Sequence, residues 1–117
     1  MSTAELAKDF TDLLKQGDHE GAARKYNDKD IVSIEAMEGP MAVCEGGEAV
    51  KQKGDWWRAN HEVHGEVVEG PYVNGNQFAV RFKMDVTPKQ TGERVMMDEV
   101  GIYTVEGDKI IEERFYY

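Results

Sequence analysis

The stretch NGNQFAVRFKMDVTPKQTGERVMMDEVGIYTVEGDKIIEERFYY, residues 74–117, carries the strongest structural signal in this chain. Apolar and polar residues alternate along it with a period of two, which is typical of half-buried β-strands. Turn signals interrupt the alternation at Asn74-Gly75, at Pro88 to Gly92 and at Gly107-Asp108. Together with the similar pattern just upstream, they predict four antiparallel strands, over residues 61–73, 76–87, 93–106 and 109–117.

The residues before this meander favour helices. Ser2 and Glu5 have the spacing of a capping box, and an apolar stripe of helical period follows until Gly17. A short second helix, a strand over about residues 30–37 and a third helix over about residues 46–60 complete the order. Helices that precede an antiparallel sheet predict a single α+β domain over residues 1–117, with a curved sheet wrapped around the N-terminal helices.

Composition narrows the classes of partner. The net charge of −9 disfavours nucleic acid and anionic membrane surfaces, both of which require a basic face. Cys44 is the only cysteine, so no disulfide forms within the chain, and we expect a reducing, cytoplasmic location. No signal peptide and no apolar stretch long enough for a bilayer is present in the sequence.

The three turns also predict how the strands pair. Centring the middle turn on Gln90 places Phe82 opposite Asp98 and Met84 opposite Met96, and closing the first turn places Val67 opposite Phe82. One face of the sheet then gathers most of the apolar side chains, whereas the other gathers opposite charges, such as Arg81 opposite Glu99. We expect the apolar face to be the inner one. Its expected members are Val63, Val67, Phe78, Val80, Phe82, Met84, Met96, Val100, Ile102, Ile111 and Phe115.

Ionisable residues on this expected inner face are the candidates for chemistry. Asp98 is predicted to lie among apolar groups, which would raise its pKa and suit it to carry a proton, with Glu113 as its partner. The expected pocket residues are Tyr117, His61, Trp57, Phe82, Met84 and Met96. Structural roles remain open: Asp98 could simply accept a hydrogen bond from Tyr117, and His61 could be a cation at a helix C-terminus.

Sites for metals and nucleotides find no support in the sequence. His19, His61 and His64 form neither a helical pair nor an HExxH motif. The glycine-rich phosphate loops and the GxSxG elbow are missing too. We therefore expect neither a metal nor an organic cofactor.

The segments 98–117 (DEVGIYTVEGDKIIEERFYY) and 47–57 (GEAVKQKGDWW) resemble the final hairpin and the third helix of SnoaL-like proteins in the NTF2-like superfamily. The turn Gly107-Asp108 reverses the Asp-Gly order that is common there. The resemblance implies a cone with a pocket, often a dimer through the sheet, in a family that includes polyketide cyclases, ketosteroid isomerases, epoxide hydrolases and proteins without known activity.

Two functions follow as hypotheses. The first is a pocket protein that binds a small apolar or carbonyl-bearing molecule and catalyses cofactor-free proton transfer through Asp98, assisted by Glu113 or Tyr117. The second is a non-catalytic, dimeric module for ligand binding or protein interaction, with the charged outer face of the sheet as its interface.

Overall fold

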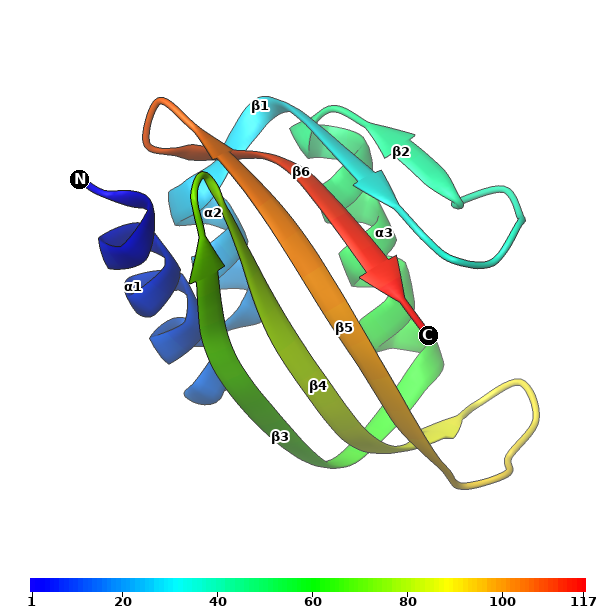
Figure 1. Ribbon diagram of the computed structural model, residues 1–117. Helices are drawn as coiled ribbons and strands as arrows, with labels where there is room; N and C mark the ends of the chain where they lie inside the picture. Colours follow the sequence, from blue (N-terminus) through cyan, green and yellow to red (C-terminus); the bar gives the residue numbers. More distant parts are fainter.

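The computed structural model describes residues 1–117. Its elements follow in the order α1 (Thr3–Lys15), α2 (His19–Tyr26), β1 (Asn27–Ile34), β2 (Val43–Glu45), α3 (Gly47–Asn60), β3 (His61–Asn74), β4 (Gln77–Pro88), β5 (Val95–Glu106) and β6 (Lys109–Tyr116). The strands form one curved, unclosed sheet in the order β2-β1-β6-β5-β4-β3, and the helices cover its concave face (Figure 1). The predicted α+β class is confirmed. None of the three helices is long and apolar enough to cross a membrane.

The helix signals in the sequence act as expected. The Ser2 hydroxyl accepts a hydrogen bond from the Glu5 amide at 3.1 Å, and the Glu5 carboxylate accepts one from the Ser2 amide at 2.9 Å, which completes the capping box. Gly17 has a φ of +81°, a conformation that suits glycine and ends α1. Asp18 then caps α2 by accepting from the Gly21 amide at 2.9 Å.

Strand β1 departs from the predicted all-antiparallel sheet. It pairs in parallel with β6, and it pairs antiparallel with β2, a short strand that sequence reasoning missed. Its inward residues are Ile31 and Ser33, both fully buried. Because alternate residues of a strand share a face, Glu35 just beyond β1 continues the same inward row.

The predicted pairing of β4 with β5 is wrong by one residue. Val86 pairs with Val95 and Phe82 pairs with Glu99, so the connection has one residue more than a turn centred on Gln90 would have. Phe82 is buried on the concave face, and its partner Glu99 therefore points to that face as well. Asp98 pairs with Lys83 on the convex face, and Met96, which is 70% exposed, also lies there with Val100 and Ile102.

In the other two hairpins, β3–β4 and β5–β6, β-bulges shift the register of the strands. A shift between Thr104 and Val105 allows both Ile110 and Glu113 to face inward on β6. Shifts in β3 turn Glu66 inward, opposite Met84, and turn Glu69 outward.

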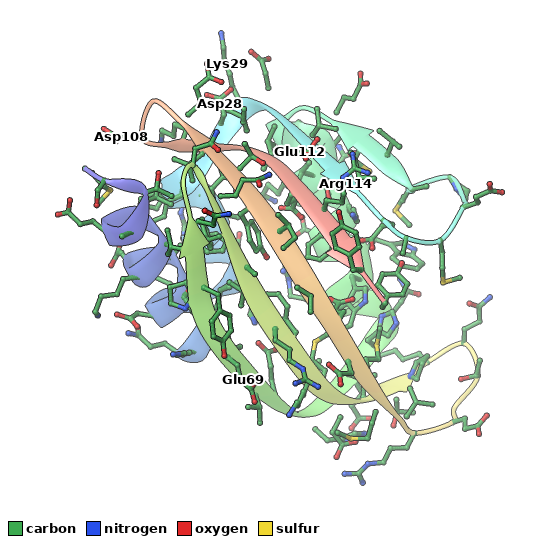
Figure 2. The ribbon with its side chains drawn as sticks, viewed as in Figure 1. Asp28, Lys29, Glu69, Asp108, Glu112 and Arg114 are labelled. Atoms are coloured by element: carbon green, nitrogen blue, oxygen red, sulfur yellow. The ribbon has the colours of Figure 1, made fainter.

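The convex face carries the charge that the sequence predicted, although with different partners. Glu69 lies 3.3 Å from Lys83 and 3.9 Å from Arg81, measured from carboxylate oxygen to side-chain nitrogen. Glu112 and Arg114, which flank Glu113 on β6, form a half-buried pair at 3.8 Å on the same face (Figure 2).

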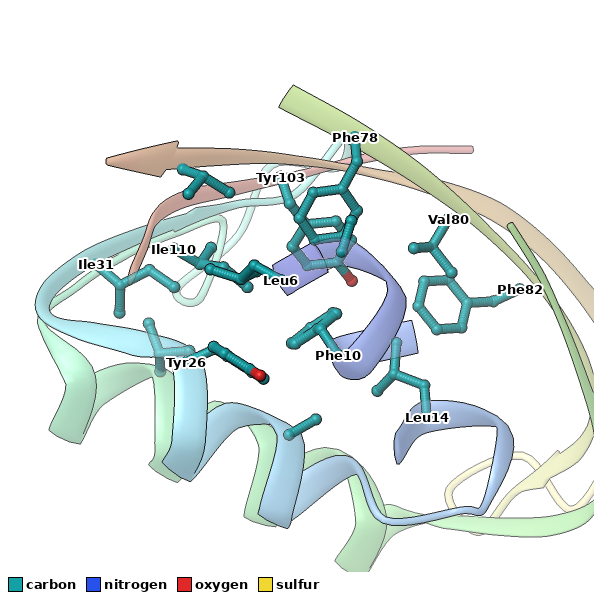
Figure 3. Close-up of a cluster of buried hydrophobic side chains, with 14 of the residues drawn as sticks. Leu6, Phe10, Leu14, Tyr26, Ile31, Phe78, Val80, Phe82, Tyr103 and Ile110 are labelled. Carbon is teal, nitrogen blue, oxygen red and sulfur yellow. The ribbon is translucent and has the colours of Figure 1, made fainter. Parts of the chain in front are cut away.

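The solid part of the core lies under α1 (Figure 3). Phe10 is 4% exposed, and its ring centroid lies 5.0 Å from that of Tyr103, 5.7 Å from that of Phe78 and 6.3 Å from that of Tyr26, each in an edge-to-face arrangement. Such contacts add to the free energy gained by burying the rings. Phe10 therefore connects α1 and α2 to the centre of the sheet.

We predict that Phe10→Ala lowers the free energy of unfolding by about 3–5 kcal/mol, because it removes a buried ring and leaves a void. Urea denaturation measures this change. Met96→Ala is the control, since Met96 is 70% exposed and its loss should change stability by less than about 0.5 kcal/mol. Equal effects of the two substitutions would contradict the assigned core.

Candidate functional site

Beyond Phe10 the concave face lines a cavity of about 1040 Å³ between the sheet and α3. Hydrophobic residues make up 17 of its 33 lining residues, and exposed residues such as Met37 and Trp56 form its mouth. A volume of this size accommodates a drug-sized organic molecule. The side chains packed around Phe10 under α1 thus fill one end of the cone, whereas the other end is open.

Most of the predicted site residues line this cavity, and two do not. Trp57, His61, Phe82, Met84, Glu113 and Tyr117 belong to the lining, whereas Asp98 and Met96 do not. The Asp98 carboxylate is 53% exposed and accepts two hydrogen bonds from the Arg81 guanidinium, at 2.8 and 3.0 Å. This guanidinium lowers the pKa of Asp98. The expected inward position of Asp98 was wrong because of the one-residue shift between β4 and β5.

Glu99 occupies the place on the concave face that was expected for Asp98. Its side chain lines the cavity and makes no hydrogen bond within the chain. Burial in the cavity wall is the largest cause that raises the pKa of Glu99 to about 7. The nearby carboxylates of Glu35, Glu113 and Glu66 raise it too, against the opposing charge of Lys53.

Glu99 faces a hydrogen-bonded group of polar residues. The Lys53 ammonium on α3 lies 2.6 Å from the Glu35 carboxylate, and only 14% of the Lys53 side chain is exposed. Lys53 also donates to the Ser33 hydroxyl at 2.8 Å, and Tyr117 donates to Glu35 at 3.1 Å. Lys53 therefore neutralises Glu35 directly and leaves Glu99 without a cationic partner.

Glu113 belongs to this group through its contact with Ser33. Its carboxylate accepts a hydrogen bond from the Ser33 hydroxyl at 3.0 Å. The pKa of Glu113 is raised, because burial, the largest cause, and the charge of Glu35 outweigh the charge of Lys53 and the hydrogen bond from Ser33, which lower it. Glu99 and Glu113 are thus two inward carboxyl groups that differ in their hydrogen bonds.

Tyr103 supplies an unused hydrogen-bond donor. It is 3% exposed, lines the cavity and has no hydrogen-bond partner for its hydroxyl within the chain. Burial raises the pKa of Tyr103 well above its usual value, so the phenol keeps its proton. Gly101 makes room for this ring, because a Cβ at that position would lie 2.9 Å from a Tyr103 ring carbon and 3.1 Å from Phe115.

Two histidines complete the wall. The His61 ring stacks on Trp57 with centroids 4.2 Å apart, and its Nδ1 lies 2.7 Å from the Trp57 carbonyl oxygen. A carbonyl oxygen only accepts, so Nδ1 carries the hydrogen and Nε2 is left as an acceptor when the ring is neutral. His19 on α2 lies 2.7 Å from Glu66, on the β3 side of the cavity. No group of three or more His, Cys, Asp or Glu side chains is arranged to hold a metal ion.

Several cavity residues were missed by sequence reasoning, namely Glu35, Lys53, Glu66, Glu99 and Tyr103. A usable signal existed for Lys53, which lies three residues after Val50 and four before Trp57 on one side of a helix. Ser33 and Glu35 share the alternation of Ile31. Their polarity suggested the solvent side instead.

We predict that Glu99→Gln changes how stability depends on pH. The folded-state pKa of Glu99, about 7, lies above the ordinary value of 4.5, so the folded protein holds this proton more tightly than the unfolded chain does. That stabilisation is complete below pH 4.5 and is lost as the pH rises to about 7. Over this window the wild type should lose up to about 3 kcal/mol relative to Glu99→Gln.

Chemical denaturation between pH 4 and 8 measures this difference. Asp98→Asn is the matched control: the pKa of Asp98 lies below 3.8, so its difference from the wild type should stay nearly constant over that range. A flat difference for Glu99→Gln as well would contradict the burial of Glu99.

Comparison with known proteins agrees with this architecture. A family model described as a SnoaL-like domain matches residues 1–117. A solved structure from Mesorhizobium loti, named as a candidate SnoaL-like polyketide cyclase and also as a carbohydrate phosphatase, is 73% identical, with 100% of both chains covered and a TM-score of 0.99. No curated protein matches the chain.

More distant structures share the fold alone. A candidate SnoaL-like polyketide cyclase from a Jannaschia species is 18% identical, with 95% of this chain and 86% of that chain covered and a TM-score of 0.71. A Catenulispora acidiphila protein with a ketosteroid isomerase-like fold, solved with trimethylamine, is 15% identical, with 99% and 87% covered and a TM-score of 0.74. The match over the whole chain and the 73% identical structure together show that this protein belongs to the SnoaL-like domain family.

Proposed function

We propose that this protein binds a small apolar molecule with a carbonyl group and transfers a proton at the carbon next to it, without a cofactor. One observation carries the proposal: Glu99 is a carboxyl group in an apolar cavity, has no partner within the chain and has a pKa of about 7. A group with that pKa both takes up and releases a proton near neutral pH. An ordinary glutamate, with a pKa of 4.5, is a much weaker base.

In the proposed step, a Glu99 carboxylate oxygen removes a proton from the carbon next to the carbonyl. The electrons of the broken C–H bond move towards the carbonyl group, so the ligand becomes an enolate with negative charge on its oxygen. Glu99 then returns the proton to the same carbon or to a conjugated one. The negative charge moves from Glu99 to the ligand and back, so the step needs no external reductant or oxidant.

The enolate oxygen requires a hydrogen-bond donor. Tyr103 suits this role, because its hydroxyl keeps its proton and has no partner within the chain. A preorganised donor of this kind stabilises charge that develops in the transition state. Glu113 remains in our proposal as the second inward acid, and Trp57, His61, Phe82, Met84 and Tyr117 as ligand-lining residues.

Hydrogen–deuterium exchange tests the proposal before the natural substrate has been identified. Cyclic and aryl ketones are incubated with the protein in deuterated buffer, and proton NMR follows deuterium uptake next to the carbonyl. We predict that Glu99→Gln lowers the exchange rate by about 10²-fold or more, since amides do not carry the proton. Tyr103→Phe should lower it as well, while retaining ligand binding.

Asp98→Asn is the matched control, because it changes the neighbouring acid on the opposite face and should leave the exchange rate unchanged. Full exchange activity in Glu99→Gln would overturn the assignment. Ketone binding without exchange by the wild type would favour a non-catalytic binding protein instead.

A dimer through the sheet is the second candidate. Tyr72, Val67 and Tyr116 are 63%, 55% and 53% exposed, and all three belong to strands of the sheet. We propose that the convex face pairs with a second copy, which would cover these side chains. Sedimentation velocity at micromolar concentration should then give a mass of two chains, whereas a monomer would contradict the dimer.

The cytoplasm stays our proposed location, based on the single Cys44.

A further inference from the structure

Ser33 is the polar residue behind the candidate site. It is fully buried on β1, lies opposite Glu113 on β6 and is not part of the cavity lining. A ligand in the cavity therefore does not meet its hydroxyl. Because a buried hydroxyl is costly without partners, the two hydrogen bonds that Ser33 makes define what it does.

Chemistry fixes the direction of the hydrogen bond between Lys53 and Ser33. An ammonium group only donates, so the Ser33 oxygen accepts from Lys53 at 2.8 Å. The single hydrogen of Ser33 is then free to point to Glu113, whose oxygen lies 3.0 Å away. Two consecutive hydrogen bonds thus connect Lys53 through Ser33 to Glu113.

These hydrogen bonds favour one distribution of charge among the carboxyl groups. A hydroxyl that donates to a carboxylate stabilises its ionised form, so Ser33 favours a charged Glu113. Lys53 similarly stabilises a charged Glu35, at 2.6 Å. Glu99 has no such donor, and the negative charges of Glu35, Glu113 and Glu66 oppose its ionisation.

We propose that Ser33 is a positioning residue that holds negative charge on Glu113 and so leaves the exchangeable proton of the cavity on Glu99. The inference deepens the proposed function and, for its catalytic meaning, rests on it. Ser33 touches neither ligand nor reacting atoms. It acts through Glu113.

Other groups also face Glu99, and they do not depend on Ser33. Glu66 on β3 adds negative charge and is hydrogen-bonded to His19 on α2. Tyr103 and Tyr117 also line the cavity beside it. Replacing Ser33 leaves all of these contacts in place, so its effect on Glu99 should pass through Glu113.

Carboxyl-carbon NMR of glutamate-labelled protein tests the inference without any substrate. In Ser33→Ala the titration midpoint of Glu113 should rise, because its hydrogen-bond donor is gone. The midpoint of Glu99 should fall by about one pH unit, since its neighbour then carries less charge. If ketone exchange is observed, the acid limb of its pH–rate profile should move to lower pH by the same amount.

Two controls separate this role from a general effect on folding. Thr104→Ala removes a hydroxyl that is bonded to Gln77 at 3.0 Å on the exposed face, and it should leave Glu99 unchanged. In a Glu113→Gln background, Ser33→Ala should cause no further shift of Glu99, because the group through which it acts is absent. Should Ser33→Ala fold poorly, Ser33→Cys keeps a similar volume with a weaker donor and should shift Glu99 in the same direction.

An unchanged Glu99 midpoint in Ser33→Ala would overturn the inference, as would an equal shift with and without Glu113. These results are distinct from failure of the proposed function. The carboxyl titration tests Ser33, whereas absence of ketone exchange in a wild type that titrates as expected would remove only the catalytic proposal.

Discussion

Removal of the Glu99 carboxyl group from bulk water, without a counter-charge of its own, governs the chemistry of this site. A charge in an apolar wall is expensive, and proteins usually neutralise it with a cation or by protonation. Here the nearby cation, Lys53, is already paired with Glu35 at 2.6 Å. Protonation remains, and the pKa of about 7 places that proton in reach of neutral-pH chemistry. The raised pKa of Glu99 thus follows from its burial and from the pairing of Lys53 with Glu35.

The fold supplies this arrangement by dividing the concave face into two parts. Around Phe10 the helices pack directly on the sheet and exclude water. Towards α3 the same face lines an open cavity. Strand β1 contributes to both: Ile31 belongs to the packed part, and Ser33 and Glu35 belong to the polar group. Curvature of the sheet alone would give a hollow cone, so it is the packing of α1 that sets where the hollow begins.

Much of the fold could be predicted from the sequence, because turns, caps and alternation are local signals. The four long strands, the three helices and the inward row of β4 follow from them. The site was harder to predict, because the functional residues interrupt the apolar pattern used to choose a face. On β5, Met96, Asp98, Val100 and Ile102 form the more apolar row, yet the structure turns Met97, Glu99, Gly101 and Tyr103 inward. Adjacent acids at 98 and 99 made either register chemically plausible. Only the length of the connection after β4 and the bulges decide between them, and these have no clear local signal.

Glu99 and Asp98, adjacent in the chain, occupy opposite faces of the sheet and therefore opposite electrostatic environments. Site-resolved carboxyl NMR of the ligand-free wild type, followed from pH 3 to pH 9, reports on both groups in one titration. We expect Glu99 to titrate near 7 and Asp98, held by Arg81, to titrate below 3.8. An ordinary midpoint for Glu99, together with a raised midpoint for Asp98, would place the acid of the cavity at position 98 and contradict this structure.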